Sequence, residues 1–195
     1  MLYLDDNIDK IKDEEIERLI SMLPEQRKAQ ALRFKHKLGR KQCVVAYMLL
    51  CKGLREEYGI EEMPVFEYGE HGKPSIVGHE DIHFNLSHCR KAVVCAISNE
   101  PIGVDIECTD RGNDNVIGYT MNEQERERID NAEDRSREFV CLWTQKEALL
   151  KLTGEGINDD IKSVLSGANM SRVSIDTFID DEKGYAYSIA KYCKK

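Results

Sequence analysis

The hydrophobic spacing of this 195-residue chain switches repeatedly between two periods, and that order restricts the folds it can form. Helical spacing comes first, short alternating runs typical of strands follow, and both patterns are then repeated. The expected helices are 13–23, a second one that begins at Pro24, 38–58, 122–131 and 136–152. The expected strands are 1–4, 64–68, 82–87, 92–97, 102–107, 172–179 and 184–192. Helices followed by strands, twice over, predict an α+β protein of two similar halves that meet near Pro101.

The composition fits a globular protein and argues against two classes of function. The net charge is −8, which disfavours general nucleic-acid binding. The longest apolar run, 43–51, is shorter than the roughly 18 residues that a membrane helix needs. The first residues lack the pattern of a signal peptide. The seven cysteines form no CxxC pair and mostly lie in apolar segments, which predicts a reducing, cytoplasmic location.

One stretch of this acidic chain is basic. From Gln26 to Arg55 there is no acidic residue, while nine residues are lysine or arginine. A local basic segment in an acidic protein is typical of a site for a small polyanion. A solvated helix face is the ordinary alternative for a run of charges.

Two carboxylates share one face of the expected strand 102–107. Because alternate side chains of a strand point the same way, Val104 and Ile106 face one side and Asp105 and Glu107 the other. Such a pair can hold one magnesium ion and leave positions for water and phosphate. The alternative is an amphipathic strand whose outer face is exposed to solvent.

The expected helix 136–152 places three chemically distinct side chains on one side. Trp143, Glu147 and Lys151 are spaced by four residues, so they line one face of the helix. Glu147 lies on the flank of the apolar stripe, where a carboxylate can bind a metal and accept a proton. Lys151, one turn later, can neutralise phosphate charge. The alternative is a Glu–Lys pair on the helix surface.

Two further segments have residue types that suit a nucleotide. In FNLSH (84–88) the apolar side chains should face the core, which sends Asn85 and Ser87 to the opposite face and leaves His88 to open a turn. A phosphate can meet the imidazole and nearby backbone N–H groups there. HGKP (71–74) is a Gly/Pro loop that lets the backbone approach a flat ring. A strand-end turn and an ordinary loop are the respective alternatives.

Taken as an ordered set, four segments resemble the Sfp-type 4′-phosphopantetheinyl transferases: HGKP (71–74), FNLSH (84–88), GVDIE (103–107) and WTQKEALLK (143–151). Members of this family transfer the phosphopantetheine arm of coenzyme A to a serine of an acyl- or peptidyl-carrier protein and release 3′,5′-ADP. The motif-bearing stretch runs from about residue 23 to residue 156.

The resemblance implies a phosphopantetheinyl transferase fold, which is a pseudo-dimer of two α+β subdomains, each with an antiparallel sheet packed on a long helix. Residues 1–101 would form the N-terminal subdomain and contact the phosphates and adenine of coenzyme A. Residues 102–195 would form the C-terminal subdomain with the metal site and the catalytic helix.

The resemblance also implies roles for individual residues of the C-terminal half. The metal ligands fall on Asp105, Glu107 and Glu147, for Mg²⁺ with Mn²⁺ as a substitute. Glu147 would also deprotonate the carrier serine, directly or through water. Lys151 would stabilise the charge of the pyrophosphate as 3′,5′-ADP leaves.

The implied coenzyme A contacts lie in the N-terminal half. Lys73 and Pro74 would flank the adenine, while Ser87 and His88 would contact phosphates, with His88 near the 3′-phosphate. The family also uses basic residues of this half for the 3′-phosphate, and the candidates here are Arg33, Arg40 and Lys41.

The expected partners are coenzyme A and an apo carrier protein, with no nucleic acid and no membrane. A monomer is expected because an internally duplicated enzyme needs no second chain. Two alternatives are retained. A magnesium-dependent phosphohydrolase explains the three carboxylates but not the GKP and Ser-His segments. A catalytically silent protein that binds coenzyme A or a carrier protein would be free to lose Asp105, Glu107, Glu147 and Lys151, which are all present.

Overall fold

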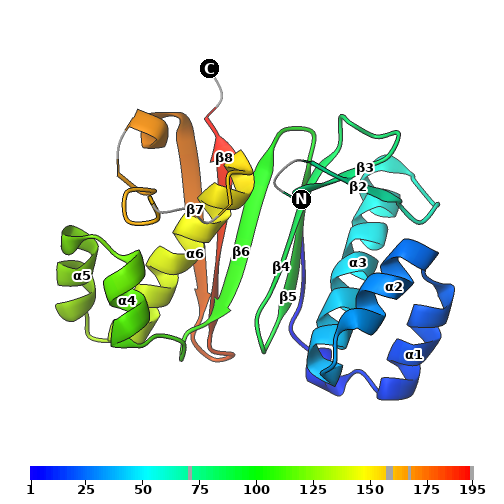
Figure 1. The fold of residues 1–195 in the computed structure, drawn as a ribbon, viewed down its shortest axis with the longest axis horizontal. Helices are drawn as coiled ribbons and strands as arrows, with labels where there is room; N and C mark the ends of the chain where they lie inside the picture. The colour runs from blue at the N-terminus through cyan, green and yellow to red at the C-terminus, as the bar shows by residue number, and fades with distance from the viewer. Residues whose placement is uncertain (70–71, 157–159, 167, 194–195) are drawn as a thin grey trace. The chain divides into compact units, whose positions relative to one another are not determined.

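The computed structural model describes residues 1–69, 72–156, 160–166 and 168–193. The chain divides into two compact units, Met1–Asn99 and Glu100–Lys195. Each unit contains a three-stranded antiparallel sheet with a long helix packed on it (Figure 1). The α+β class expected from the sequence is therefore confirmed. A two-fold relation between the units, as in a pseudo-dimer, stays a prediction.

The first unit is organised around one long apolar helix, which packs on its sheet and carries two shorter helices (Figure 1). The long helix ends at Gly59, whose left-handed φ of 67° suits a residue without a side chain. The strand order in the sheet is β1-β5-β4, and β2 pairs with β3 in a separate hairpin. The elements are β1 (Leu2–Asp5), α1 (Asp13–Met22), α2 (Glu25–Arg33), α3 (Lys37–Tyr58), β2 (Phe66–Tyr68), β3 (Pro74–Ile76), β4 (His83–His88) and β5 (Val93–Ser98).

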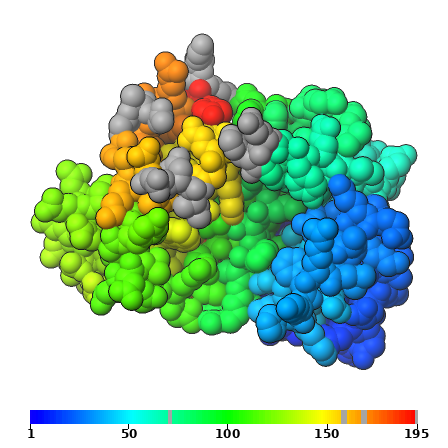
Figure 2. Space-filling model, viewed as in Figure 1, coloured from blue at the N-terminus to red at the C-terminus, as the bar shows by residue number. Residues whose placement is uncertain are grey.

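The second unit is organised around α6, which lies across one face of a sheet of order β6-β8-β7 and contacts all three strands (Figure 1). The helix α5 packs against α6. In the space-filling view of Figure 2, α1 and α2 (blue) lie on the surface of the first unit, and α4 and α5 (light green) lie on the surface of the second. The elements are β6 (Ile102–Cys108), α4 (Asp114–Thr120), α5 (Glu123–Asp130), α6 (Arg135–Thr153), β7 (Val173–Asp180) and β8 (Tyr185–Tyr192).

Besides the short 3₁₀ helices Ile8–Lys10 and Ala168–Arg172, the structure contains two elements that the sequence analysis does not predict. Residues 114–120 form α4, a helix that the apolar spacing does not predict, and Asn113 caps it by accepting a hydrogen bond from the Val116 N–H at 3.1 Å. Pro74, expected in the loop 71–74, instead begins β3 (Pro74–Ile76), which pairs with β2. The Asn113 cap stabilises α4, and pairing with β2 stabilises β3. Hydrophobic spacing reveals neither interaction.

The surroundings of the cysteines agree with their apolar sequence context. Six of the seven thiols are buried and Cys193 is exposed, so most of them act as small hydrophobic side chains. Across the described ranges, every helix is too short or too polar to cross a membrane.

The tightest contact between sheet and helix in the second unit lies at Gly103 of β6. A Cβ atom there would stand 2.0 Å from the Ala148 carbonyl oxygen and 2.6 Å from the Leu152 nitrogen, both in α6. Only glycine therefore permits this approach. Because alternate residues of a strand share a face, Asp105 and Glu107 lie on the same side of β6 as Gly103 and face α6.

We expect Gly103→Ala to lower the free energy of unfolding by at least about 2 kcal/mol, because the clash is with backbone atoms that no rotamer change relieves. Gly118→Ala is the matched control. Gly118 lies within α4 with nothing near its Cβ position, so this change should raise the free energy of unfolding by about 0.5–1 kcal/mol. Urea denaturation measures both, and a neutral Gly103→Ala would contradict the close approach.

Candidate active site

The two carboxylates of β6 are buried and neutralised by cations. Asp105 and Glu107 are 6% and 7% exposed, and every residue of β6 is buried. The alternative of an amphipathic strand with a wet outer face is therefore wrong. Lys151 Nζ donates to Asp105 Oδ1 at 2.6 Å. Arg111 forms an ion pair with Glu107, whose Oε1 also accepts from the Cys108 N–H at 2.9 Å. Such partners offset the cost of burying a carboxylate.

Glu147 belongs electrostatically to the same cluster. Burial raises the pKa of Glu147, and the charges of Asp105 and Glu107 raise it further, while Lys151 and Arg111 oppose the shift. The ion pair that Lys151 makes is with Asp105 across the helix–sheet interface. A simple Glu147–Lys151 pair on the helix surface therefore does not describe this site.

The donor chemistry of the cluster fits a hard divalent cation. Three carboxylates supply oxygen ligands of the kind that Mg²⁺ and Mn²⁺ prefer. Burial raises the pKa of Glu147, and the negative charges of Asp105 and Glu107 raise it further, so a bound divalent cation would favour the charged form of this carboxyl group. Within the described ranges no group of three or more His, Cys, Asp or Glu side chains is arranged as a ready set of metal ligands. In this structure Lys151 balances the negative charge of Asp105, and Arg111 balances that of Glu107.

A buried set of hydroxyl groups ties α6 to the sheet beside the carboxylates. Ser188 of β8 lies directly opposite Asp105 in the strand register. Its Oγ is 2.8 Å from Thr144 Oγ1 of α6 and 2.9 Å from Thr177 Oγ1 of β7. Gln145 Nε2 donates to the same Thr177 oxygen at 2.9 Å. Sequence reasoning missed these contacts, because no spacing within one helix reveals which strand it will meet.

In the first unit, Arg33 lines a pocket of about 410 Å³ with Gln26, Gln30 and Tyr68, a size typical of small-molecule sites. Tyr68, which lines this pocket, pairs directly with Pro74 in the β2–β3 register. In the described part of the chain, Arg33 has no carboxylate partner. Burial lowers the pKa of Lys73. His71, the first residue of the HGKP motif, lies outside the described residues.

The other two basic candidates lie in a different place. Arg40 pairs with Glu17 at 3.2 Å, and Lys41 pairs with Asp13 at 3.1 Å and donates to the Ile11 carbonyl at 2.5 Å. The small pocket that they line also contains these two acidic residues. Arg40 and Lys41 are thus neutralised by α1, whereas Arg33 is not.

Ser87 and His88 end β4. Ser87 is 7% exposed and His88 is exposed. Asn85 is also buried, so the strand face that carries Asn85 and Ser87 is covered. Gln42 of α3 donates to the carbonyl oxygen of the residue after His88 at 2.7 Å and fixes the turn. The imidazole therefore stands at an anchored strand end.

Comparison with known proteins agrees with this geometry. The sequence model of the 4′-phosphopantetheinyl transferase superfamily matches residues 101–191, which include β6 and α6 with Asp105, Glu107, Glu147 and Lys151. A 4′-phosphopantetheinyl transferase from Bacillus pumilus, psf-1, is 31% identical over 159 residues, which cover 80% of this chain and 68% of that protein. The chain therefore belongs to the 4′-phosphopantetheinyl transferase superfamily and is of the Sfp type.

Two relatives from Bacillus subtilis give the same family. The transferase Sfp of strain 168 is 28% identical over 151 residues, covering 76% of this chain and 67% of its own length. A second 4′-phosphopantetheinyl transferase is 28% identical over 147 residues, covering 74% and 66% respectively. The chain thus spans about two thirds of the length of the curated relatives that it matches.

Proposed function

We propose that this chain transfers the 4′-phosphopantetheine moiety of coenzyme A to the serine of an apo acyl- or peptidyl-carrier protein and releases 3′,5′-ADP. The observation that carries the proposal is the buried pair Asp105 and Glu107 of β6, with Lys151 of α6 2.6 Å from Asp105 and Glu147 one helical turn before Lys151. The similarity to three bacterial 4′-phosphopantetheinyl transferases supports the reaction type.

Each residue of the cluster then has a chemical task. Asp105, Glu107 and Glu147 would hold Mg²⁺ or Mn²⁺, which supplies charge neutralisation to the pyrophosphate of coenzyme A. Lys151 donates hydrogen bonds to the pyrophosphate as 3′,5′-ADP leaves. Glu147 takes the proton of the carrier serine, directly or through water.

The coenzyme A contacts belong to the first unit in this proposal. Lys73 and Pro74 flank the adenine, and Ser87 and His88 contact phosphate. For the 3′-phosphate we favour Arg33 over Arg40 and Lys41, because Arg33 lines a pocket of suitable size and the other two are paired with carboxylates of α1. A guanidinium also matches phosphate in a bidentate geometry.

The proposal also covers the oligomeric state, the cellular location and the partners of the protein. The enzyme acts as a monomer in the cytoplasm, on coenzyme A and a carrier protein, without a nucleic-acid or membrane partner. Support comes from the acidic net charge and from the six buried thiols, which need a reducing compartment.

Intact-mass measurement tests the reaction. The protein with Mg²⁺, coenzyme A and a panel of apo carrier proteins should add one phosphopantetheine to a carrier, and EDTA should stop the addition. Glu147→Gln should abolish transfer while coenzyme A binding stays within about threefold, because two metal ligands and the first-unit contacts remain. Transfer at the wild-type rate by Glu147→Gln would refute the role of this carboxylate. Tight coenzyme A binding without transfer to any carrier would indicate a silent binding protein.

The choice among basic residues gives a separate prediction. Arg33→Ala should weaken coenzyme A by at least about tenfold and dephospho-coenzyme A far less, since a lost charge-assisted hydrogen bond costs that much. His88→Ala should show the same selectivity. Arg40→Ala is the matched control and should change both affinities by less than about threefold, because Glu17 already holds that guanidinium. Calorimetric titration measures all three variants. Equal losses for the two ligands would show that neither Arg33 nor His88 reads the 3′-phosphate.

A further inference from the structure

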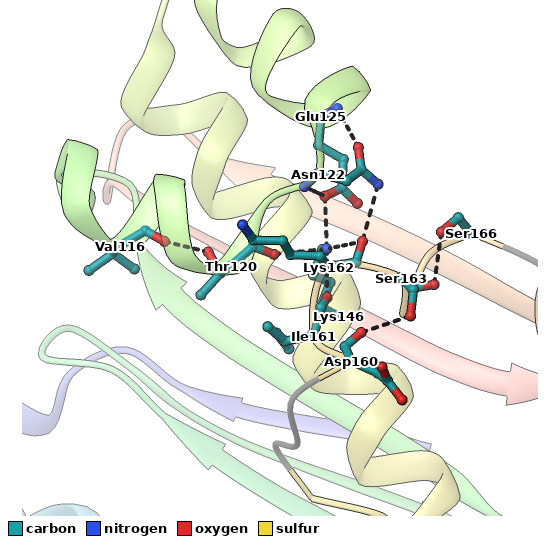
Figure 3. Close-up of polar contacts among 10 residues, drawn as sticks. All are labelled: Val116, Thr120, Asn122, Glu125, Lys146, Asp160, Ile161, Lys162, Ser163 and Ser166. Carbon is teal, nitrogen blue, oxygen red and sulfur yellow. Dashed lines mark hydrogen bonds and ion pairs between the residues drawn. The ribbon is translucent and has the colours of Figure 1, made fainter.

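Lys146 lies in the same helical stretch as Glu147, and the proposed chemistry gives it no task. Its side chain is fully buried, with 0% exposed. Adjacent residues of an α-helix point about 100° apart, so Lys146 projects from a different flank of α6 than Glu147 does. Figure 3 shows it reaching toward the end of α4, the start of α5 and the segment 160–166.

Four oxygen atoms surround the Lys146 ammonium. Nζ donates to the backbone carbonyls of Thr120 at 3.0 Å, Ile161 at 2.8 Å and Lys162 at 3.3 Å, and pairs with Glu125 Oε2 at 2.8 Å (Figure 3). An ammonium has three N–H donors, so its hydrogen-bonding capacity is filled. Because a buried charge without such partners is very unfavourable, this position requires a cation of this length.

The carboxylate that balances Lys146 is itself held in place. Glu125 Oε2 accepts from the Asn122 N–H at 2.8 Å, and Asn122 Oδ1 accepts from the Glu125 N–H at 2.9 Å, which together form the capping box of α5. Asn122 Nδ2 also donates to the Lys162 carbonyl at 3.1 Å. The acceptors of the ammonium are thus themselves linked by hydrogen bonds through Asn122.

Consecutive residues of α6 hold the helix from different directions. Thr144 contacts β8, Gln145 contacts β7, and Lys146 contacts α4, α5 and the segment 160–166. Glu147, the next residue, lies one turn before Lys151, which donates to Asp105 of β6, so both side chains lie on the helix face toward β6. A rotation of α6 that moved Glu147 would have to break the contacts of Lys146.

We propose that Lys146 is a positioning residue: its buried contacts fix the rotation of α6 and thereby set the orientation of Glu147 at the carboxylate cluster. This inference rests on the function proposed above. Transfer would then depend on a residue that contacts neither coenzyme A nor the carrier protein.

Paired variants separate positioning from stability. Lys146→Met keeps the length of the side chain but leaves Glu125 buried without a counter-charge. Adding Glu125→Gln removes that charge and retains an acceptor suited to the capping box. The double variant should therefore recover stability relative to Lys146→Met. Its kcat for transfer should nevertheless stay at least about tenfold below wild type, with the KM for coenzyme A within about twofold.

Lys162→Met is the matched control. It removes one lysine charge from the same neighbourhood, but the Lys162 side chain is exposed and only its backbone carbonyl contacts Lys146. Its kcat should remain within about twofold of wild type. All measurements belong at a temperature at which circular dichroism shows each variant to be folded.

Hydrogen exchange of the backbone amides of α6 supplies a readout that does not depend on transfer. Exchange at residues 147–151 should be faster in the double variant than in wild type and unchanged in Lys162→Met. Wild-type kcat in the double variant, or a lower kcat with unchanged exchange in α6, would overturn the positioning role. If the wild-type protein transfers nothing, the proposed function fails, and the exchange data still decide whether Lys146 fixes α6.

Discussion

The close contact between α6 and β6 at Gly103 is the constraint on which the candidate active site depends. It brings a helix within van der Waals distance of strand backbone, and so places Glu147 and Lys151 opposite the two β6 carboxylates. A larger residue at Gly103 would lift α6 and separate the acidic strand from the helix that supplies the third carboxylate and the lysine. The alternation of β6 then matters as much as the glycine, because it directs Gly103, Asp105 and Glu107 to one side.

Two lysine–carboxylate pairs in the described part of the second unit have different surroundings, which match different tasks. Lys146 is fully enclosed, bonded to backbone carbonyls and paired with a carboxylate that caps a helix. The Lys151 side chain is 28% exposed and pairs with a carboxylate of the cluster. The first arrangement has no room for a ligand and fixes structure. The second leaves a cation accessible to an anionic substrate, as the proposed reaction requires.

Much of the fold and part of the site follow from the sequence. The expected strand 102–107 and helix 136–152 match β6 and α6 to within one residue at each end, because alternation and helical spacing are strong signals there. The shared face of Asp105 and Glu107 follows from the same alternation. Burial of β6 on both faces, the Lys151–Asp105 pair and the network of Lys146 depend on tertiary packing, which no local spacing encodes. The distinction between Arg33 and Arg40 likewise depends on Glu17, which lies on another helix.

Direct measurement of metal binding is the sharpest test of whether the carboxylates of β6 and α6 form a single metal site. Electron paramagnetic resonance of Mn²⁺ in the presence of coenzyme A should detect one bound ion per chain in the wild-type protein. Asp105→Asn should weaken that binding at least about tenfold, since a charged oxygen ligand is lost from a cluster of three. Unchanged Mn²⁺ affinity in Asp105→Asn, or no binding to wild type, would contradict the assignment of these carboxylates as a metal and phosphate site.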